Sequence, residues 1–296
     1  MSAPALARRP GRDPRVVKRT KQISLNGFGL LIALVTLFPI FWMVSTAFKP
    51  SQEIYSLTPS LLPAHPTFGN FSQVISGQAS GIGTVWLFFR NSLSVTLATV
   101  LIASLLALLA SVAVARFNFR FRGSFLVMLL IVQMIPGQAL IIGLFREFER
   151  LNLLQNLLGL ILVYAGQALP VSIWMLRNFV TTVPKELEEA AAIDGASALT
   201  IFWRILFPLV APGLVATSIF SFVTAYNEFI VALTFLGQAH STYTLPIYVT
   251  YFFGRGGAQW GPIMAASTMY TIPVMIFFLI VRRRLVGGLV AGAVKG

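Results

Sequence analysis

Residues 91–115 read NSLSVTLATVLIASLLALLASVAVA, a run without one charged side chain. A helix that crosses the hydrocarbon core of a bilayer needs about 20 mostly apolar residues. Together with the aromatic residues before it, this run forms an apolar stretch over 86–115, which is long enough to cross a bilayer and extend past it. The stretch therefore predicts a membrane-spanning helix.

Five more apolar stretches of spanning length lie on either side of this one. The six expected spans cover residues 27–48, 86–115, 125–145, 157–179, 210–236 and 262–281. Four prolines fall inside them, at Pro39, Pro136, Pro170 and Pro273. Membrane helices tolerate proline where neighbouring helices or water satisfy the freed backbone carbonyls. The sequence predicts an all-α membrane protein with six transmembrane helices.

The composition excludes other classes of protein. The 296 residues are 56% hydrophobic and 10% charged, whereas soluble domains have about 25% charged residues and disordered chains still more. The chain has no cysteine, so disulfides are excluded, and its two histidines lie far apart without a cluster of carboxylates. A metal site is therefore not expected. Because no P-loop motif occurs, we expect no ATP site in this chain.

The net charge of +13 indicates the orientation in the membrane. If the N-terminus is cytoplasmic, 17 of the 22 Lys and Arg residues fall in the cytoplasmic segments and five in the external ones. This asymmetry follows the positive-inside rule and places both termini in the cytoplasm. The expected organisation is a basic cytoplasmic leader (1–25), a six-helix membrane domain (26–281) and a cytoplasmic tail (282–296). Because the basic residues flank the membrane, nucleic acid is not an expected partner.

The most informative segment lies between the fourth and fifth spans, at about 181–209. It contains the run VPKELEEAAAIDG at 183–195. Pro184 suits a first helical position, and Gly195 suits the left-handed turn that ends a helix. A second helix is expected over 197–207, ending at Pro208. This segment is either a surface for another protein, with Glu189 available to pair with a cation, or a plain connector.

A resemblance to a known family, carried by six residues, decides between these two interpretations. Glu189, Ala190, Ala191, Gly195, Ile205 and Pro208 resemble the signature loop of binding-protein-dependent ABC importer permeases, with Phe207 where that family usually has leucine. Four other motifs resemble the carbohydrate-uptake subgroup, and specifically its maltose-type second permease subunit. They are Arg90-Asn-Ser-Leu, Ala115-Arg-Phe, Ala225-Tyr-Asn-Glu-Phe and the final Gly292-Ala-Val-Lys-Gly.

The resemblance implies a function and a set of partners. Such a chain is a transport subunit and not an enzyme, in the inner membrane of a prokaryote. It forms half of a sugar pathway with a second homologous permease subunit. Two ATP-binding subunits hold the ATP and Mg²⁺, and an external solute-binding protein delivers the sugar. The helix before Gly195 would be the coupling helix, with Glu189 paired to an arginine of the ATPase, and the tail residues Val294, Lys295 and Gly296 would be a second ATPase contact.

The residues that line the pathway are harder to identify. Glu228 is the only acidic residue in an expected span, and a charge at mid-membrane costs roughly 2.5–3.5 kcal/mol. It could line the pathway with Asn227 and Tyr226, which offer hydrogen bonds to sugar hydroxyls, or it could hold the fifth helix against a neighbour. Gln133 is a further candidate, although isolated polar residues often serve contacts between helices.

Two other functions stay open. The importer could carry glycerol phosphate or another polar solute, but the near absence of cations within the spans favours a neutral sugar. An ion-coupled secondary carrier would place several ionisable residues at mid-membrane and carry inverted repeats, and neither feature is evident. The proline-rich external segment 49–85 is either a docking surface or an ordinary loop.

Overall fold

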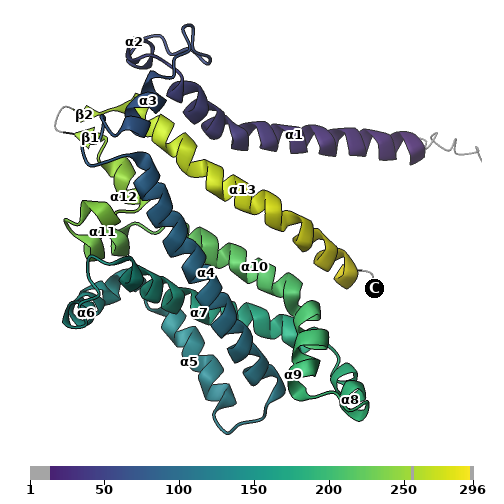
Figure 1. Ribbon diagram of the computed structural model, residues 1–296. Helices are drawn as coiled ribbons and strands as arrows, with labels where there is room; N and C mark the ends of the chain where they lie inside the picture. The colour runs from purple at the N-terminus through teal and green to yellow at the C-terminus, as the bar shows by residue number, and fades with distance from the viewer. Residues whose placement is uncertain (1–13, 255–256, 294–296) are drawn as a thin grey trace, which may run out of the picture.

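The computed structural model of the chain describes residues 14–254 and 257–293, with side chains over 22–254 and 257–282. The regular secondary structure of the described part is helical apart from a two-stranded antiparallel hairpin, and loops connect the elements (Figure 1). The helices up to residue 182 are α1 (Pro14–Ala47), α2 (Ser51–Ile54), α3 (Gly69–Ser76), α4 (Val85–Arg116), α5 (Arg122–Met134), α6 (Gly137–Arg150) and α7 (Leu157–Thr182). The later elements are α8 (Glu186–Ile193), α9 (Ala198–Ile201), the π-helical η1 (Phe202–Leu206), α10 (Phe207–Tyr226), α11 (Ile230–Leu236), η2 (His240–Thr242), α12 (Leu245–Thr250), β1 (Phe253–Gly254), β2 (Gly257–Ala258) and α13 (Trp260–Ala293).

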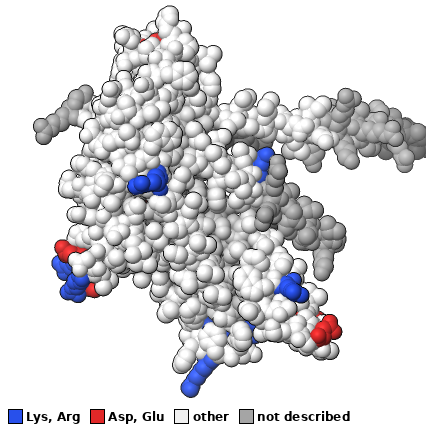
Figure 2. Space-filling view, in the orientation of Figure 1, with Lys and Arg blue, Asp and Glu red and all other residues white. Residues whose placement is uncertain are grey.

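Within the described residues, five continuous helical stretches are long and apolar enough to cross a bilayer. They are Gln22–Ala47, Val85–Arg116, Leu157–Thr182, Ala198–Tyr226 and Trp260–Arg282. A sixth crossing is available if the bent pair α5 and α6 counts as one span. Most of the surface seen in Figure 2 carries neither acidic nor basic residues, as a surface facing lipid should. The predicted all-α membrane fold is confirmed, with one span broken.

The expected third span, 125–145, is not one straight helix. Helix α5 ends at Met134, α6 begins at Gly137, and the two are bent by 96°. Ile135 precedes Pro136, and a residue before proline is driven out of the helical region; Ile135 accordingly has an extended backbone, with ψ 121°. Proline and glycine in succession therefore end one helix and start another within the membrane domain.

The expected fifth span, 210–236, has different limits. Pro208 does not end the preceding helix, because the chain continues from α9 through η1 into α10. In the π-helical turn the amide of Phe207 donates to the carbonyl of Phe202, which accommodates the proline without breaking the helix. At its other end the span stops at Tyr226, and α11 starts afresh at Ile230. Glu228 thus lies in a break between two helices.

The expected leader and tail also join the helices next to them. Helix α1 begins at Pro14, inside the expected leader, and α13 extends to Ala293, beyond the expected boundary at residue 282. Helix α1 packs against α13, while the window of α1 that could span the membrane has no residue buried within this chain.

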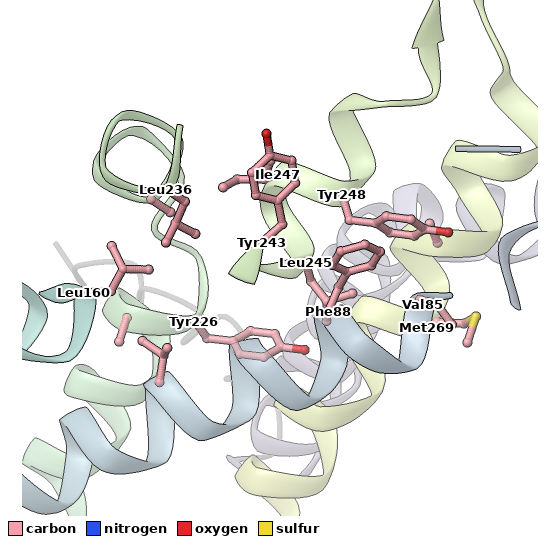
Figure 3. Packing of buried hydrophobic residues seen from close by; sticks show 14 of the residues in the cluster. Val85, Phe88, Leu160, Tyr226, Leu236, Tyr243, Leu245, Ile247, Tyr248 and Met269 are labelled. Carbon is pink, nitrogen blue, oxygen red and sulfur yellow. The ribbon is translucent and has the colours of Figure 1, made fainter. Parts of the chain in front are cut away.

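Helices α4, α7 and α10 form the centre of the molecule, with α2, α3 and the hairpin at one end and α8 and α9 at the other (Figure 1). At the hairpin end, the ring of Tyr248 stacks on Phe88 with centroids 4.5 Å apart (Figure 3). Asn91 donates to the carbonyls of Ser241 and Tyr243, both at 2.9 Å, and Ser92 accepts from the amide of Leu245. The Arg90-Asn-Ser-Leu motif therefore fastens the chain after α11 onto α4.

Candidate functional site

A cavity of about 690 Å³ lies beside the bend between α5 and α6. Its other walls come from α7 and from the region where α10 gives way to α11, and most of its lining is apolar. We call it the bend cavity. The polar side chains that line it are Gln133, Gln138, Gln167, Thr224 and Glu228. Ligand sites are commonly of this form, with an apolar wall and a few polar groups that orient the ligand.

Glu228 lines this cavity and is held there by three donors. The amides of Val231 and Ala232, in the first turn of α11, donate to its two carboxylate oxygens at 2.9 and 3.0 Å. The hydroxyl of Tyr164, on α7, donates to one of them at 2.7 Å. A carboxylate at the start of a helix also interacts favourably with the helix dipole. The two interpretations of this residue are thus compatible, since Glu228 joins α7 to α11 and still faces the cavity.

The neighbours of Glu228 in sequence are placed differently. Tyr226 is 1% exposed, stacks on Tyr270 and is not among the residues that line the cavity. Its hydroxyl donates to the carbonyl of Tyr270. Asn227 is exposed but does not line the cavity; its amide donates to the carbonyl of Val223, and its oxygen accepts from the Tyr270 hydroxyl at 2.7 Å. Both side chains are engaged within the protein.

Gln133 lies at the end of α5 and lines the cavity, as does Gln167 on α7. The sequence does not indicate Gln138 as a site residue, because its apolar pattern predicts one continuous helix over 125–145. The signal that could have found it is the dipeptide Pro136-Gly137, a pair that marks turns. The bend brings Gln133 and Gln138 to the wall of one cavity.

The second candidate site is the segment 181–209, which we call the α8 loop. Helix α8 begins at Glu186, two residues later than expected, and Gly195 follows it with a φ of +83°, which confirms the expected left-handed turn. No residue of α8 is buried. Glu189 and Ala190 are exposed, and Ala191 is half-buried. Ile193 is 88% exposed beside them, so the loop presents an apolar as well as an acidic surface.

The other residues of the expected signature are more enclosed or lie elsewhere. Ile205 is half-buried in η1, and Pro208 is exposed at the start of α10. The tail residues Val294, Lys295 and Gly296 lie outside the described residues. Sequence reasoning did not find an ion pair between Arg116, at the end of α4, and Glu188 of α8.

Comparisons with known proteins agree on one family. The model of the binding-protein-dependent transport system inner membrane component matches residues 103–289. The diacetylchitobiose uptake system permease protein DasC of Streptomyces coelicolor is 41% identical over 90% of this chain and 94% of its own length. The trehalose/maltose transport system permease protein MalG of Thermococcus litoralis is 35% identical over 93% of this chain and 98% of its own.

A solved structure has the same fold. A chain of a bacterial ABC transporter involved in the import of the acidic polysaccharide alginate superposes with a TM-score of 0.75 over 94% of this chain and 99% of that one, at 21% identity. This chain therefore belongs to the binding-protein-dependent transport system inner membrane component family, as a permease subunit of the carbohydrate-uptake ABC importers, which confirms the family identified from its motifs.

Proposed function

We propose that this chain forms half of the translocation pathway for a neutral sugar or oligosaccharide, and that its bend cavity faces that pathway. The observation that carries the proposal is the chemistry of the cavity wall. Three glutamines and a threonine offer neutral hydrogen-bond donors and acceptors to sugar hydroxyls, and Glu228 adds one carboxylate acceptor. Relatives named for diacetylchitobiose and for trehalose or maltose support the same class of substrate.

The cavity wall gives less support to a phosphorylated substrate. Recognition of a phosphate group commonly uses Arg or Lys. Among the described residues that line the bend cavity there is neither Lys nor Arg. Glycerol phosphate is therefore a poorer candidate than a neutral sugar.

The partners follow from the same proposal. A second permease subunit completes the pathway, two ATP-binding subunits hydrolyse ATP with Mg²⁺, and an external binding protein delivers the sugar. A solved bacterial alginate ABC transporter, in complex with a periplasmic protein that carries an alginate pentasaccharide, supports the proposed external binding protein. The positive-inside asymmetry supports an inner-membrane orientation with both termini in the cytoplasm.

In this proposal the α8 loop is the contact with the ATPase. Its exposed glutamates suit a basic groove, and the exposed Ile193, with Leu187 at 46%, suits an apolar one. Glu189 is the residue we expect to pair with an arginine of the ATPase. Val294, Lys295 and Gly296 are proposed as a second contact.

The test of this contact is the substitution Glu189→Ala in the full transporter, reconstituted into vesicles with its partner subunits. We expect ATP-driven sugar uptake to be abolished, because the variant removes the charge that pairs with the ATPase. Glu186→Ala is the matched control, since Glu186 is an exposed glutamate on the first turn of the same helix. Wild-type uptake by the Glu189→Ala transporter would overturn the contact.

A further inference from the structure

Arg116 makes a side-chain connection between helix α8 and the membrane domain. The guanidinium of Arg116, in the last turn of α4, donates from Nε to a carboxylate oxygen of Glu188 at 2.7 Å. Its Nη2 lies 2.7 Å from the same oxygen and also donates to the carbonyl of Val183, which follows α7, at 2.9 Å. Arg116 thus joins the end of α4, the end of α7 and the first turn of α8.

This ion pair is shielded from solvent. The side chains of Arg116 and Glu188 are 10% and 20% exposed. The other ion pair within the part of the chain that the structure describes, Arg150–Glu147, is 74% and 63% exposed and joins residues on one helix. Exposed ion pairs contribute little to stability. A shielded pair with several hydrogen bonds resists separation, because breaking it leaves a buried charge without a partner.

The rest of the packing leaves α8 dependent on this attachment. The helix has no buried residue, and it packs mainly against α9 and η1, the elements that follow it in the chain. Helices α4 and α7, by contrast, pack extensively on each other and on α10. Besides the short covalent connection from α7 through residues 183–185, the contact that Arg116 makes gives a force applied to α8 a direct route to the ends of α4 and α7.

We propose that Arg116 and Glu188 are a positioning pair that makes α8 move as one body with α4 and α7, so that displacement of the α8 loop is transmitted to the membrane helices. The inference rests on the proposed function, in which the α8 loop receives movement from the ATPase. It adds a separate element: Glu189 is exposed and would contact the partner, while Glu188 faces inward and holds the loop to its own chain. Adjacent glutamates therefore have different roles.

The experiment compares Arg116→Gln, Glu188→Gln and the double variant in the full reconstituted transporter. ATP hydrolysis, sugar uptake and co-purification of the ATPase are measured together. We expect each single variant to keep the ATPase bound and hydrolysing ATP, while sugar transported per ATP falls about tenfold, within the usual range of coupling between sites. The double variant should be no worse than either single one, because the two residues act as a unit. Arg120→Gln and Glu186→Gln are exposed controls that should leave the ratio unchanged.

Other outcomes would overturn the proposal in distinguishable ways. If Glu189→Ala abolishes uptake but the Arg116 and Glu188 variants keep the wild-type ratio, the pair has no part in transmission. If the variants lose the ATPase, or if their effects add, the pair serves docking or folding instead. If Glu189→Ala transports normally while Arg116→Gln does not, the ATPase contact fails and the positioning pair stands. Arg116→Lys, which keeps the charge without the planar fork, should retain part of the ratio; a ratio as low as that of Arg116→Gln would rule out the charge as the attachment.

Discussion

At the scale of single residues, Glu228 shows how a carboxylate is accommodated in a membrane domain. An unpaired charge there is costly, but this one accepts two backbone amides and a tyrosine hydroxyl. The break between α10 and α11 supplies the amides, since the first turn of α11 has no helical acceptor for them. The break between α10 and α11 therefore supplies donors to Glu228, and Glu228 in turn satisfies the free amides of α11. The apolar pattern around them predicts neither feature.

The variant Glu228→Gln should destabilise the assembled transporter, because one of the two carboxylate oxygens becomes an NH2 group, which cannot accept from an α11 amide. We expect a loss of about 1–3 kcal/mol, the usual penalty when a buried donor or acceptor loses its hydrogen-bond partner. Tyr164→Phe removes one donor and leaves the α11 cap, so its loss should be smaller. Thermal unfolding of the purified complex measures both, and a larger loss in Tyr164→Phe would contradict this order. If Glu228→Gln also leaves sugar affinity and transport unchanged, Glu228 has no role in the pathway.

At the scale of helices, α7 and α10 are in close contact at Gly213. A β-carbon built there would collide with the ring and β-carbon of Phe179. Small residues allow membrane helices to pack closely, and serines reinforce the packing. Ser172 and Ser221, one on each of these two helices, lie 3.4 Å apart at their hydroxyls. The contact between α7 and α10 therefore depends on the absence of a side chain at Gly213 as well as on the two serines.

Replacing this glycine should separate the two helices. We expect Gly213→Val to lower the stability of the complex by about 1–3 kcal/mol, the usual cost of overpacking, and to lower the yield of folded protein. Gly143→Val is the control, because nothing lies within 4 Å of a β-carbon at Gly143. Thermal unfolding of the two variants in detergent tests the contact, and equal stability would show that Phe179 moves aside freely.

The same scale shows what the sequence could and could not predict. Hydropathy located the five continuous crossings among the described residues and the bent pair α5 and α6, because a crossing needs a run of apolar residues. Hydropathy could not locate the points where a span is interrupted, because proline has different effects in different membrane helices. The helix ends just before Pro136, whereas it continues through Pro208. The spacing that identified the α8 loop is local, whereas Arg116 and Glu188 are 72 residues apart. No local pattern pairs them, and the walls of the bend cavity likewise come from five separate elements, α5, α6, α7, α10 and α11.

At the scale of the whole molecule, the charge asymmetry and the fold together assign each end of the molecule to one side of the membrane. The fold places α2, α3 and the hairpin at one end of the central helices and the α8 loop at the other (Figure 1). The charge rule assigns the first end to the outside and the second to the cytoplasm. If the assignment were reversed, the α8 loop could not meet an ATPase in the cytoplasm. Orientation is thus the condition on which both the proposed ATPase contact and the positioning pair depend.

Because the chain has no cysteine, single cysteines can report on this orientation without a background. Leu57, fully exposed at the end with α2, and Ile193, 88% exposed in α8, are suitable positions. We expect a membrane-impermeant thiol reagent to label Leu57→Cys in intact spheroplasts and Ile193→Cys only in inverted membrane vesicles. Added detergent should make both accessible, which controls for thiols shielded by partner subunits. Labelling of Ile193→Cys in intact spheroplasts would show that the orientation is the reverse of the one assigned. The α8 loop would then lie outside the cell, where it could not contact a cytoplasmic ATPase.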